Sequence, residues 1–195
     1  MKAILISINP KWVAKILNGE KTLEIRKTLP KCKLPIDVYI YCTKDNQNTL
    51  MTSLGGKYIV QKGNMTRYFA KNWKDEKHPI LNGKVVAKFT LKEIRDVYAI
   101  HFPNGYHYRA TDLTTDQLEQ KSCLSQLDLN FYLRKHKGYA WQINDLFVFS
   151  KPKTLSDFLI PSHKVPGIDR DGSEKTFTIL KPLNRAPQSW CFVEI

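Results

Sequence analysis

The sequence has few of the residues that build disulfide frameworks and metal centres. It contains only four cysteines and five histidines in 195 residues. The cysteines form no CxxC pair and show no regular spacing, and His101 and His107 fit neither a helical metal pair nor a zinc-protease motif. We therefore expect reduced cysteines in a cytoplasmic protein, no metal and no other cofactor.

Long apolar runs are also missing from the sequence. The apolar stretch at residues 3–8 is too short for the core of a signal peptide, and it leads directly into Pro10-Lys11-Trp12. We therefore expect no membrane segment and no membrane partner. Apolar residues still make up 42% of the chain, which is enough for a hydrophobic core, and 195 residues fit one domain with insertions.

Acidic residues are scarce relative to basic ones. The chain has 31 Lys and Arg residues against 18 Asp and Glu residues, which gives a formal net charge of +13. Such an excess favours polyanionic partners, chiefly nucleic acid, through contacts with phosphates. The alternative is a protein that simply carries many surface lysines. Because aromatic residues are interleaved with the basic ones, we favour contact with nucleic acid.

The most informative segment is residues 19–26, Gly-Glu-Lys-Thr-Leu-Glu-Ile-Arg. A short amphipathic helix is predicted before it, because Asn9 can cap a helix, Pro10 suits its first turn and Gly19 can end it. Within the segment, apolar residues alternate with polar ones, which is typical of a strand with one face toward a core. The other face then carries charged side chains and forms a candidate anion or nucleobase site.

Lys21, Glu24 and Arg26 supply the charges of this candidate site. Glu24 and Arg26 share a face of the predicted strand at about 7 Å, near enough for an ion pair. Lys21 and Glu24 are three residues apart, so their side chains start on opposite faces unless the strand begins with a turn or bulge. The triplet predicts either a structural ion pair or a pocket for a base, in which Glu24 accepts a hydrogen bond from an amino group.

Strands account for most of the predicted order. Apolar and alternating runs predict strands at residues 2–8, 22–27, 36–43 and 187–195, a long or bent strand at 84–97, and a strand or hairpin at 138–150. Helix-compatible segments follow within residues 111–137, where Thr114 and Ser125 are candidate caps. The order has no strand-helix-strand rhythm. It therefore predicts an α+β protein, mainly β, built as a small mixed β-barrel of about six strands with flanking helices.

Two stretches interrupt this pattern, at about residues 44–82 and 160–184. Both are rich in polar residues, glycine or proline, and a short helix is expected within the first, around residues 67–73. Residues 101–109 form a polar-aromatic cluster that we expect in a loop. The histidines of that cluster are candidates for catalysis, although a surface position is the simpler account of them.

Three separated segments together resemble the ASCH domain, a branch of the PUA-like superfamily, in its bacterial and phage form. They are residues 19–26, residues 138–143 with 151–158, and residues 185–194. The glycine, lysine and arginine of the family signature, with a frequent glutamate between them, match Gly19, Lys21, Glu24 and Arg26. The resemblance implies a PUA-like β-barrel with a cleft beside the first helix, in one domain over residues 1–195 with insertions at about 44–82 and 160–184.

The resemblance also implies a function. Proteins similar to this one have been assigned RNA binding, so we expect an RNA- or nucleotide-binding protein. One bacterial branch is an amidohydrolase that deacetylates acetylated cytidine, and its nucleophilic lysine matches Lys21, with Glu24 here in place of a threonine. Another relative is a ribonuclease, which would act without metal in this chain. A third alternative is a module for phage or host protein interactions that uses the two insertions.

Further residues complete the predicted site. Besides the triplet, we expect Trp12, Tyr41 and Ser189 to contact a base or nucleotide, the first two by stacking. Three lysines directly after the triplet are expected to contact a nucleic-acid backbone: Lys27, Lys31 and Lys33. For hydrolysis, Lys21 and Glu24 would be the catalytic residues. Trp141 and Trp190 lie in apolar strands and are expected in the core.

Overall fold

A seven-stranded mixed sheet forms the body of the protein. The structure is a computed structural model that describes residues 1–53, 55–63, 80–103 and 105–195. The strand order in this sheet is β10-β6-β3-β1-β13-β11-β12. The strands are β1 Lys2–Ile8, β3 Ile36–Cys42, β6 Val85–Leu91, β10 Asn144–Lys153, β11 Leu159–Ile168, β12 Glu174–Pro182 and β13 Trp190–Glu194. Only the β1–β3 pair is parallel among the described strand pairs of this sheet.

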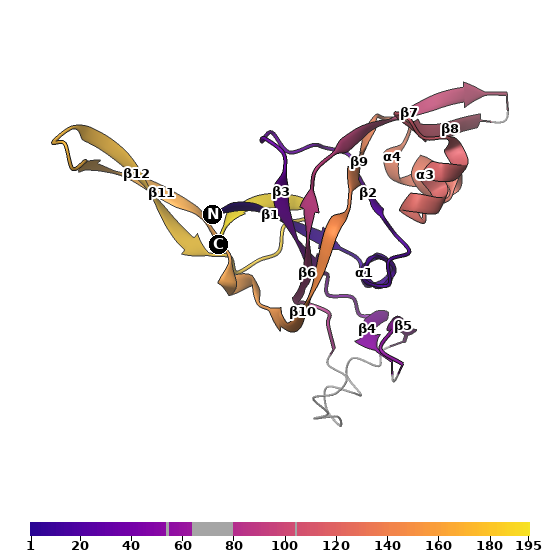
Figure 1. Cartoon of the computed structure of the whole chain (residues 1–195), viewed down its shortest axis with the longest axis horizontal. Coiled ribbons are helices and arrows are strands. Elements are labelled where there is room, and N and C mark those ends of the chain that lie inside the picture. The colour runs from indigo at the N-terminus through magenta and orange to yellow at the C-terminus, as the bar shows by residue number, and fades with distance from the viewer. Residues whose placement is uncertain (54, 64–79, 104) are drawn as a thin grey trace.

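A four-stranded antiparallel sheet stands beside the first one, in the order β2-β9-β7-β8 (Figure 1). Its strands are β2 Leu23–Arg26, β7 Ile94–Phe102, β8 Gly105–Ala110 and β9 Gly138–Gln142. Two helices cover one of its faces: α3 Thr115–Ser122 and α4 Gln126–Leu133. A short 3-10 helix, Leu155–Asp157, links β10 to β11. The fold is therefore mainly β with flanking helices, as the sequence predicts.

Helix α1, Pro10–Leu17, crosses from β1 toward β2 and covers one face of the larger sheet. Asn9 caps it by accepting a hydrogen bond from the Lys11 amide at 3.0 Å, and proline occupies its first turn, both as predicted. β1 is buried on both faces, as expected for a central strand. Alternate residues, such as Ile4 and Ile6, pack toward α1, whereas Ala3 and Leu5 face a separate cluster on the other side.

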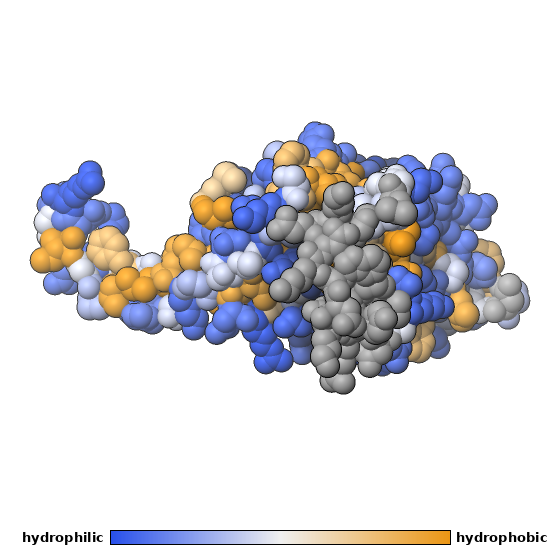
Figure 2. Space-filling view, turned by 90° about the horizontal axis from the view of Figure 1, so that it is seen from below, coloured by the Kyte–Doolittle hydropathy of each residue, from blue (hydrophilic) through white to orange (hydrophobic). Residues whose placement is uncertain are grey.

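Residues 44–82 contribute a small antiparallel hairpin, β4 Asn48–Thr52 with β5 Tyr58–Lys62, which packs against α1. The helix predicted around residues 67–73 lies outside the described residues. Residues 160–184 form most of the β11–β12 hairpin, which projects as an arm from the body (Figure 1). Figure 2 shows that this arm stands clear of the rest and carries both hydrophilic and hydrophobic residues.

Two predictions for the middle of the chain are wrong. The strand predicted over residues 84–97 is two strands, because the chain leaves β6 at Lys92 and enters the second sheet as β7. The loop predicted over residues 101–109 is the end of the long β7–β8 hairpin, in which His101 pairs with Tyr106 and Ile100 with His107. Aromatic and imidazole side chains on both faces hide the alternation that would indicate a strand.

No helix in the described part of the chain is long and apolar enough to cross a membrane.

The predicted caps of the two later helices are confirmed, and each forms a capping box. Thr114 pairs with Gln117 at the start of α3, and Ser125 pairs with Asp128 at the start of α4. The second cap is important for the site, because it fixes the helix that closes it.

Candidate functional site

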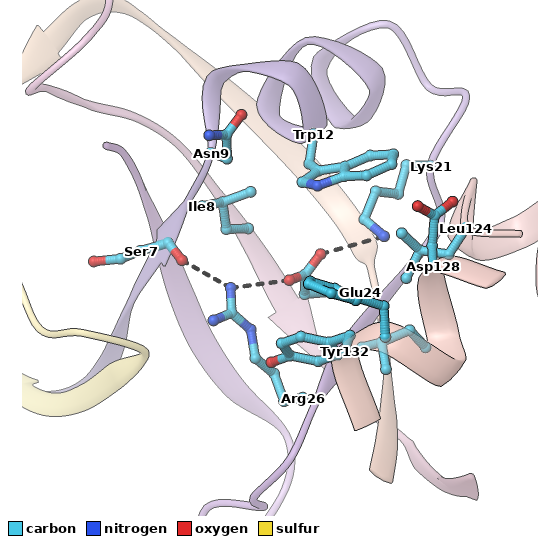
Figure 3. Close-up of a pocket in the computed structure, with 12 residues that line it drawn as sticks. Ser7, Ile8, Asn9, Trp12, Lys21, Glu24, Arg26, Leu124, Asp128 and Tyr132 are labelled. Atoms are coloured by element: carbon cyan, nitrogen blue, oxygen red, sulfur yellow. Dashed lines mark hydrogen bonds and ion pairs between the residues drawn. The ribbon is translucent and has the colours of Figure 1, made fainter. Parts of the chain in front are cut away.

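The sequence triplet lies in a pocket between α1, β2 and α4 (Figure 3). The cavity has a volume of about 300 Å³. Its lining comes from three segments of the chain: Ser7, Ile8, Asn9 and Trp12; Lys21, Glu24, Ile25 and Arg26; and Leu124, Asp128, Phe131 and Tyr132. The structure thus brings Lys21, Glu24, Arg26 and Trp12 to one cavity.

Glu24 lies between the two cations. Its Oε1 is 2.9 Å from Nη2 of Arg26, and its Oε2 is 3.4 Å from Nζ of Lys21. All three side chains are almost fully buried, with exposed fractions of 2% for Lys21, 9% for Glu24 and 8% for Arg26. Because ion pairs in such surroundings are poorly screened by solvent, this one holds the three groups in a fixed arrangement.

Lys21 is the most enclosed of the three. Its Nζ donates a hydrogen bond to the carbonyl oxygen of Ser122 at 2.6 Å and lies 5.5 Å from the centre of the Trp12 ring. Burial lowers the pKa of Lys21 below its ordinary value of 10.5, and the neighbouring Glu24 carboxylate opposes that change. The ammonium is therefore held by hydrogen bonding and charge against the cost of losing water.

Arg26 connects the pocket to the larger sheet. Its Nη2 donates to the carbonyl oxygen of Ser7 at 2.8 Å, and its Nη1 donates to Oγ of Ser189 at 3.2 Å. Its Nε is buried and has no hydrogen-bond partner among the described residues. A buried guanidinium nitrogen without a partner costs free energy, so the other hydrogen bonds and the ion pair of Arg26 must offset that cost.

The turn after α1 explains why Lys21 reaches Glu24. Gly19 adopts a φ of +76°, the left-handed conformation that glycine accepts without strain. The amides of Glu20 and Lys21 then both donate to the carbonyl of Lys15, at 2.9 and 3.0 Å. Lys21 therefore precedes β2 and is not part of its pleat. Its side chain does not follow the alternation of a regular strand, so it can lie on the same side as Glu24.

Helix α4 supplies the outer wall of the pocket. It approaches closely because position 138 is glycine: a Cβ there would meet the Leu133 side chain at 2.8 Å and the Arg26 carbonyl oxygen at 3.4 Å. In Figure 3, Tyr132 and Trp12 lie on opposite sides of Glu24. Phe131 sits at the mouth and is 78% exposed. The site is therefore flanked by aromatic rings from two helices.

The charges that line the pocket balance. Lys21 and Arg26 are opposed by Glu24 and by Asp128 at the mouth. The Ser125 hydroxyl and amide donate to the Asp128 carboxylate at 2.7 and 3.0 Å, and these hydrogen bonds lower the pKa of Asp128 below its ordinary value. The pocket offers both donors and acceptors with little net charge.

Two lysines flank the aromatic walls. Nζ of Lys11 lies 4.3 Å from the Trp12 ring centre, and Nζ of Lys27 lies 5.0 Å from the Tyr132 ring centre. Both lysines are exposed, so their ammonium groups are accessible to a ligand that extends out of the pocket. We call Lys11 and Lys27 the rim lysines.

The fold is shared with two solved crystal structures. One is an ASCH protein from Zymomonas mobilis, with a TM-score of 0.52, 15% sequence identity, and coverage of 98% of this chain and 87% of that one. The other is a serine-to-alanine variant of the Zymomonas mobilis protein, with a TM-score of 0.50, 14% identity, and coverage of 98% and 88%. The fold is that of an ASCH domain. No protein-family model and no curated protein sequence matches the chain.

Other residues predicted for the site take different positions around the ASCH fold. Ser189 accepts a hydrogen bond from Arg26 through its Oγ, but it does not line the cavity. Tyr41 lies away from the pocket: it is 4% exposed and packs with Tyr39 and Phe158 on the opposite face of the larger sheet. Lys31 and Lys33 are exposed residues of the loop after β2.

Sequence reasoning missed the contribution of α4 and of Lys11. Asp128, Phe131 and Tyr132 follow a cap that the sequence does reveal, but no local pattern shows that the helix packs beside β2. The signal that could have found them is the Phe131-Tyr132 pair shortly before the basic run at residues 134–137. No group of His, Cys, Asp and Glu side chains suited to a metal ion occurs among the described residues.

The lowered pKa of Lys21 predicts a pH dependence of stability. Between that lowered value and 10.5, the unfolded chain binds more protons than the folded one, so this group makes folding more favourable as the pH rises. Urea titrations at increasing alkaline pH should show wild type gaining stability relative to a Lys21→Met variant. Lys15 is the control: Glu20 raises its pKa, so wild type should lose stability relative to Lys15→Met as the pH rises. The same sign for both variants would contradict the assignment.

Proposed function

We propose that the pocket beside α1 binds one base of single-stranded RNA, or of a nucleotide, and that the rim lysines contact the phosphates next to it. The observation that carries this proposal is the charge-balanced polar floor flanked by aromatic rings. It suits a flat neutral group with hydrogen-bond donors and acceptors, which is what a nucleobase is.

The balance of charge argues for the base in the pocket and the phosphate outside it. A phosphate at the floor would meet Glu24 as well as the two cations, so it would gain little net attraction. A base has complementary partners there. The Glu24 carboxylate has acceptor positions beyond the two it uses for Lys21 and Arg26, and these suit the amino group of a base.

The size and walls of the cavity are consistent with this ligand. Its volume of about 300 Å³ lies at the lower end of the range for small-molecule sites. Trp12 and Tyr132 lie on either side of the Glu24 carboxylate, so a base bound there would have an aromatic ring on each side (Figure 3). Phe131, exposed at the mouth, offers a further ring for a neighbouring base.

The geometry supports binding better than hydrolysis by Lys21. Burial does lower the pKa of Lys21, which a nucleophilic amine requires. Its Nζ, however, is held against the carbonyl of Ser122 and the carboxylate of Glu24, two acceptors that stabilise the charged ammonium. In that state the nitrogen has no lone pair for attack, whereas its use as a fixed donor needs none.

The rim lysines provide the first test. Fluorescence anisotropy with labelled single-stranded RNA should show binding whose logarithmic affinity falls linearly with the logarithm of salt concentration. Replacing both residues, as Lys11→Gln and Lys27→Gln, is expected to reduce that slope by about 1.4, since single strands give about 0.7 per phosphate contact. The control variant, Lys31→Gln with Lys33→Gln, removes the same amount of charge from the exposed loop that follows β2. A protein that binds neither RNA nor free nucleotides at low salt would refute the proposal.

A further inference from the structure

We propose that the outer face of the β7–β8 hairpin is a second contact surface for single-stranded nucleic acid, separate from the pocket. We call it the hairpin face. It consists of Tyr98, Ile100, Phe102, His107 and Arg109. The inference goes beyond the proposed function, because it concerns a surface that does not line the cavity.

The strand register places these residues together. Tyr98 pairs with Arg109, Ile100 with His107, and Phe102 with Gly105. Directly paired residues of an antiparallel ladder point to the same side, so all five side chains of the hairpin face lie on one side of the ribbon. The intervening residues, such as Val97 and Tyr108, point to the other side and pack in the core under α3 and α4.

The hairpin face is open and aromatic. Tyr98 is 42% exposed and Phe102 is 43% exposed, and Arg109 is exposed beside them. The rings of Phe102 and His107 contact each other edge to face, with centres 5.0 Å apart. Figure 1 shows that the hairpin extends beyond the helices, so no other described element covers its end. Exposed rings on a pleated ribbon form a platform for stacked bases.

The charge of this region matches a polyanion. Residues 97–110 contain no Asp or Glu, and α4 is followed directly by the run Arg-Lys-His-Lys at 134–137. Lys135 of that run contacts the other side of the same ribbon, where its Nζ is 4.8 Å from the Tyr106 ring centre, so the run adds positive charge near the hairpin end and not on the hairpin face itself. The nearest acid on the strand, Asp96, is already paired with Lys137 at 2.9 Å. Cations and rings without free carboxylates suit phosphates and bases.

The same features disfavour a protein partner. Protein interfaces concentrate apolar residues at their centre and keep charges at the rim. On the hairpin face, by contrast, Arg109 lies directly opposite Tyr98, and His107 lies opposite Ile100. Tyr98 and Phe102 are four strand residues apart, or about 13 Å, so their rings would serve separate bases of an extended strand.

The test compares labelled RNA strands of about four and about sixteen nucleotides by fluorescence anisotropy, lengths that span the usual range of single-strand sites. A Tyr98→Ala, Phe102→Ala variant is expected to weaken binding of the long strand by at least about tenfold and to leave binding of the short strand unchanged within about twofold. Arg109→Gln is expected to lower the salt slope of long-strand binding by about 0.7. It serves as the test on its own if the double variant does not fold.

The matched control lies on the other hairpin. Phe177 is 41% exposed on β12, and Arg170 is exposed near the end of the same arm, so Phe177→Ala and Arg170→Gln remove similar groups elsewhere. Long-strand affinity that is unchanged in the hairpin variants, or lowered equally in the controls, overturns the inference. In one outcome, a change at the pocket residue Trp12 weakens binding of the short strand while the hairpin variant leaves binding of the long strand unchanged. That result would refute the hairpin face and leave the proposed function intact. The reverse pattern would refute the pocket and support the hairpin face.

Discussion

A Glu24→Gln variant is expected to lose about 3–5 kcal/mol of unfolding free energy, the cost typical of breaking a buried ion pair by removing one partner. Glu24 is the carboxylate between two cations that are each more than nine-tenths buried. The amide keeps the shape of the side chain and removes only its charge. Lys21 can then lose its proton, but Arg26 cannot, so one buried charge stays uncompensated.

The control for this prediction is an exposed pair close by in the sequence. Glu20 pairs with Lys15 at 3.0 Å, and the two side chains are 51% and 35% exposed. Glu20→Gln should cost less than about 1 kcal/mol, because solvent screens the pair. Chemical denaturation followed by tryptophan fluorescence measures both values. Equal losses in the two variants would show that the Lys21–Glu24–Arg26 arrangement contributes nothing special to stability. Adding Lys21→Met to Glu24→Gln should restore part of the loss.

The sequence predicts best those parts of the site that are formed by residues close together in the chain. The pairing of Glu24 with Arg26 follows from the two-residue period of a strand, and the structure has it at 2.9 Å. The approach of Lys21 needed the turn at Gly19, which the sequence also signals. Both faces of β2 are buried, however, whereas the alternation suggested only one. The charged face became enclosed because α1 and α4 pack beside it, and such long-range packing leaves no local trace.

The position of Tyr41 shows a second limit. Its strand was predicted, over residues 36–43. The two-residue period of a strand does not say which of its two faces turns toward the site. Ile40 and Cys42 pack in the cluster under α1, so Tyr41 must face the other side, away from the pocket. The face of the larger sheet on which α1 packs therefore decides that Tyr41, a predicted stacking residue, lies away from the pocket.

The hairpin at residues 94–110 illustrates the converse case. Its aromatic and basic residues were recognised as a cluster, but their pattern did not indicate strands. Once the register is known, they divide into a face that packs under the helices and the exposed hairpin face. The functional hypothesis for these residues thus depends on pairing between strands, which residue composition alone does not give.

Removing both aromatic walls of the pocket is expected to have the largest effect on binding. A Trp12→Ala, Tyr132→Ala variant should bind short single-stranded RNA about a hundredfold more weakly, since each stacking contact contributes about 1–3 kcal/mol and two of about 1.4 kcal/mol multiply to that factor. Both side chains are only partly buried, so the fold should tolerate the change. Phe147, which is 57% exposed on β10, gives the matched control Phe147→Ala.

The measurement is anisotropy with short RNA, together with competition by free nucleotides, on variants whose circular dichroism and melting temperature match wild type. Loss of affinity for the free nucleotide as well as for RNA would locate the effect at the base and not at the backbone. If the double variant binds both ligands as tightly as Phe147→Ala does, then no base stacks between α1 and α4. The buried triplet would then be what the simpler sequence interpretation offers, an ion pair that fixes β2 beside its helices.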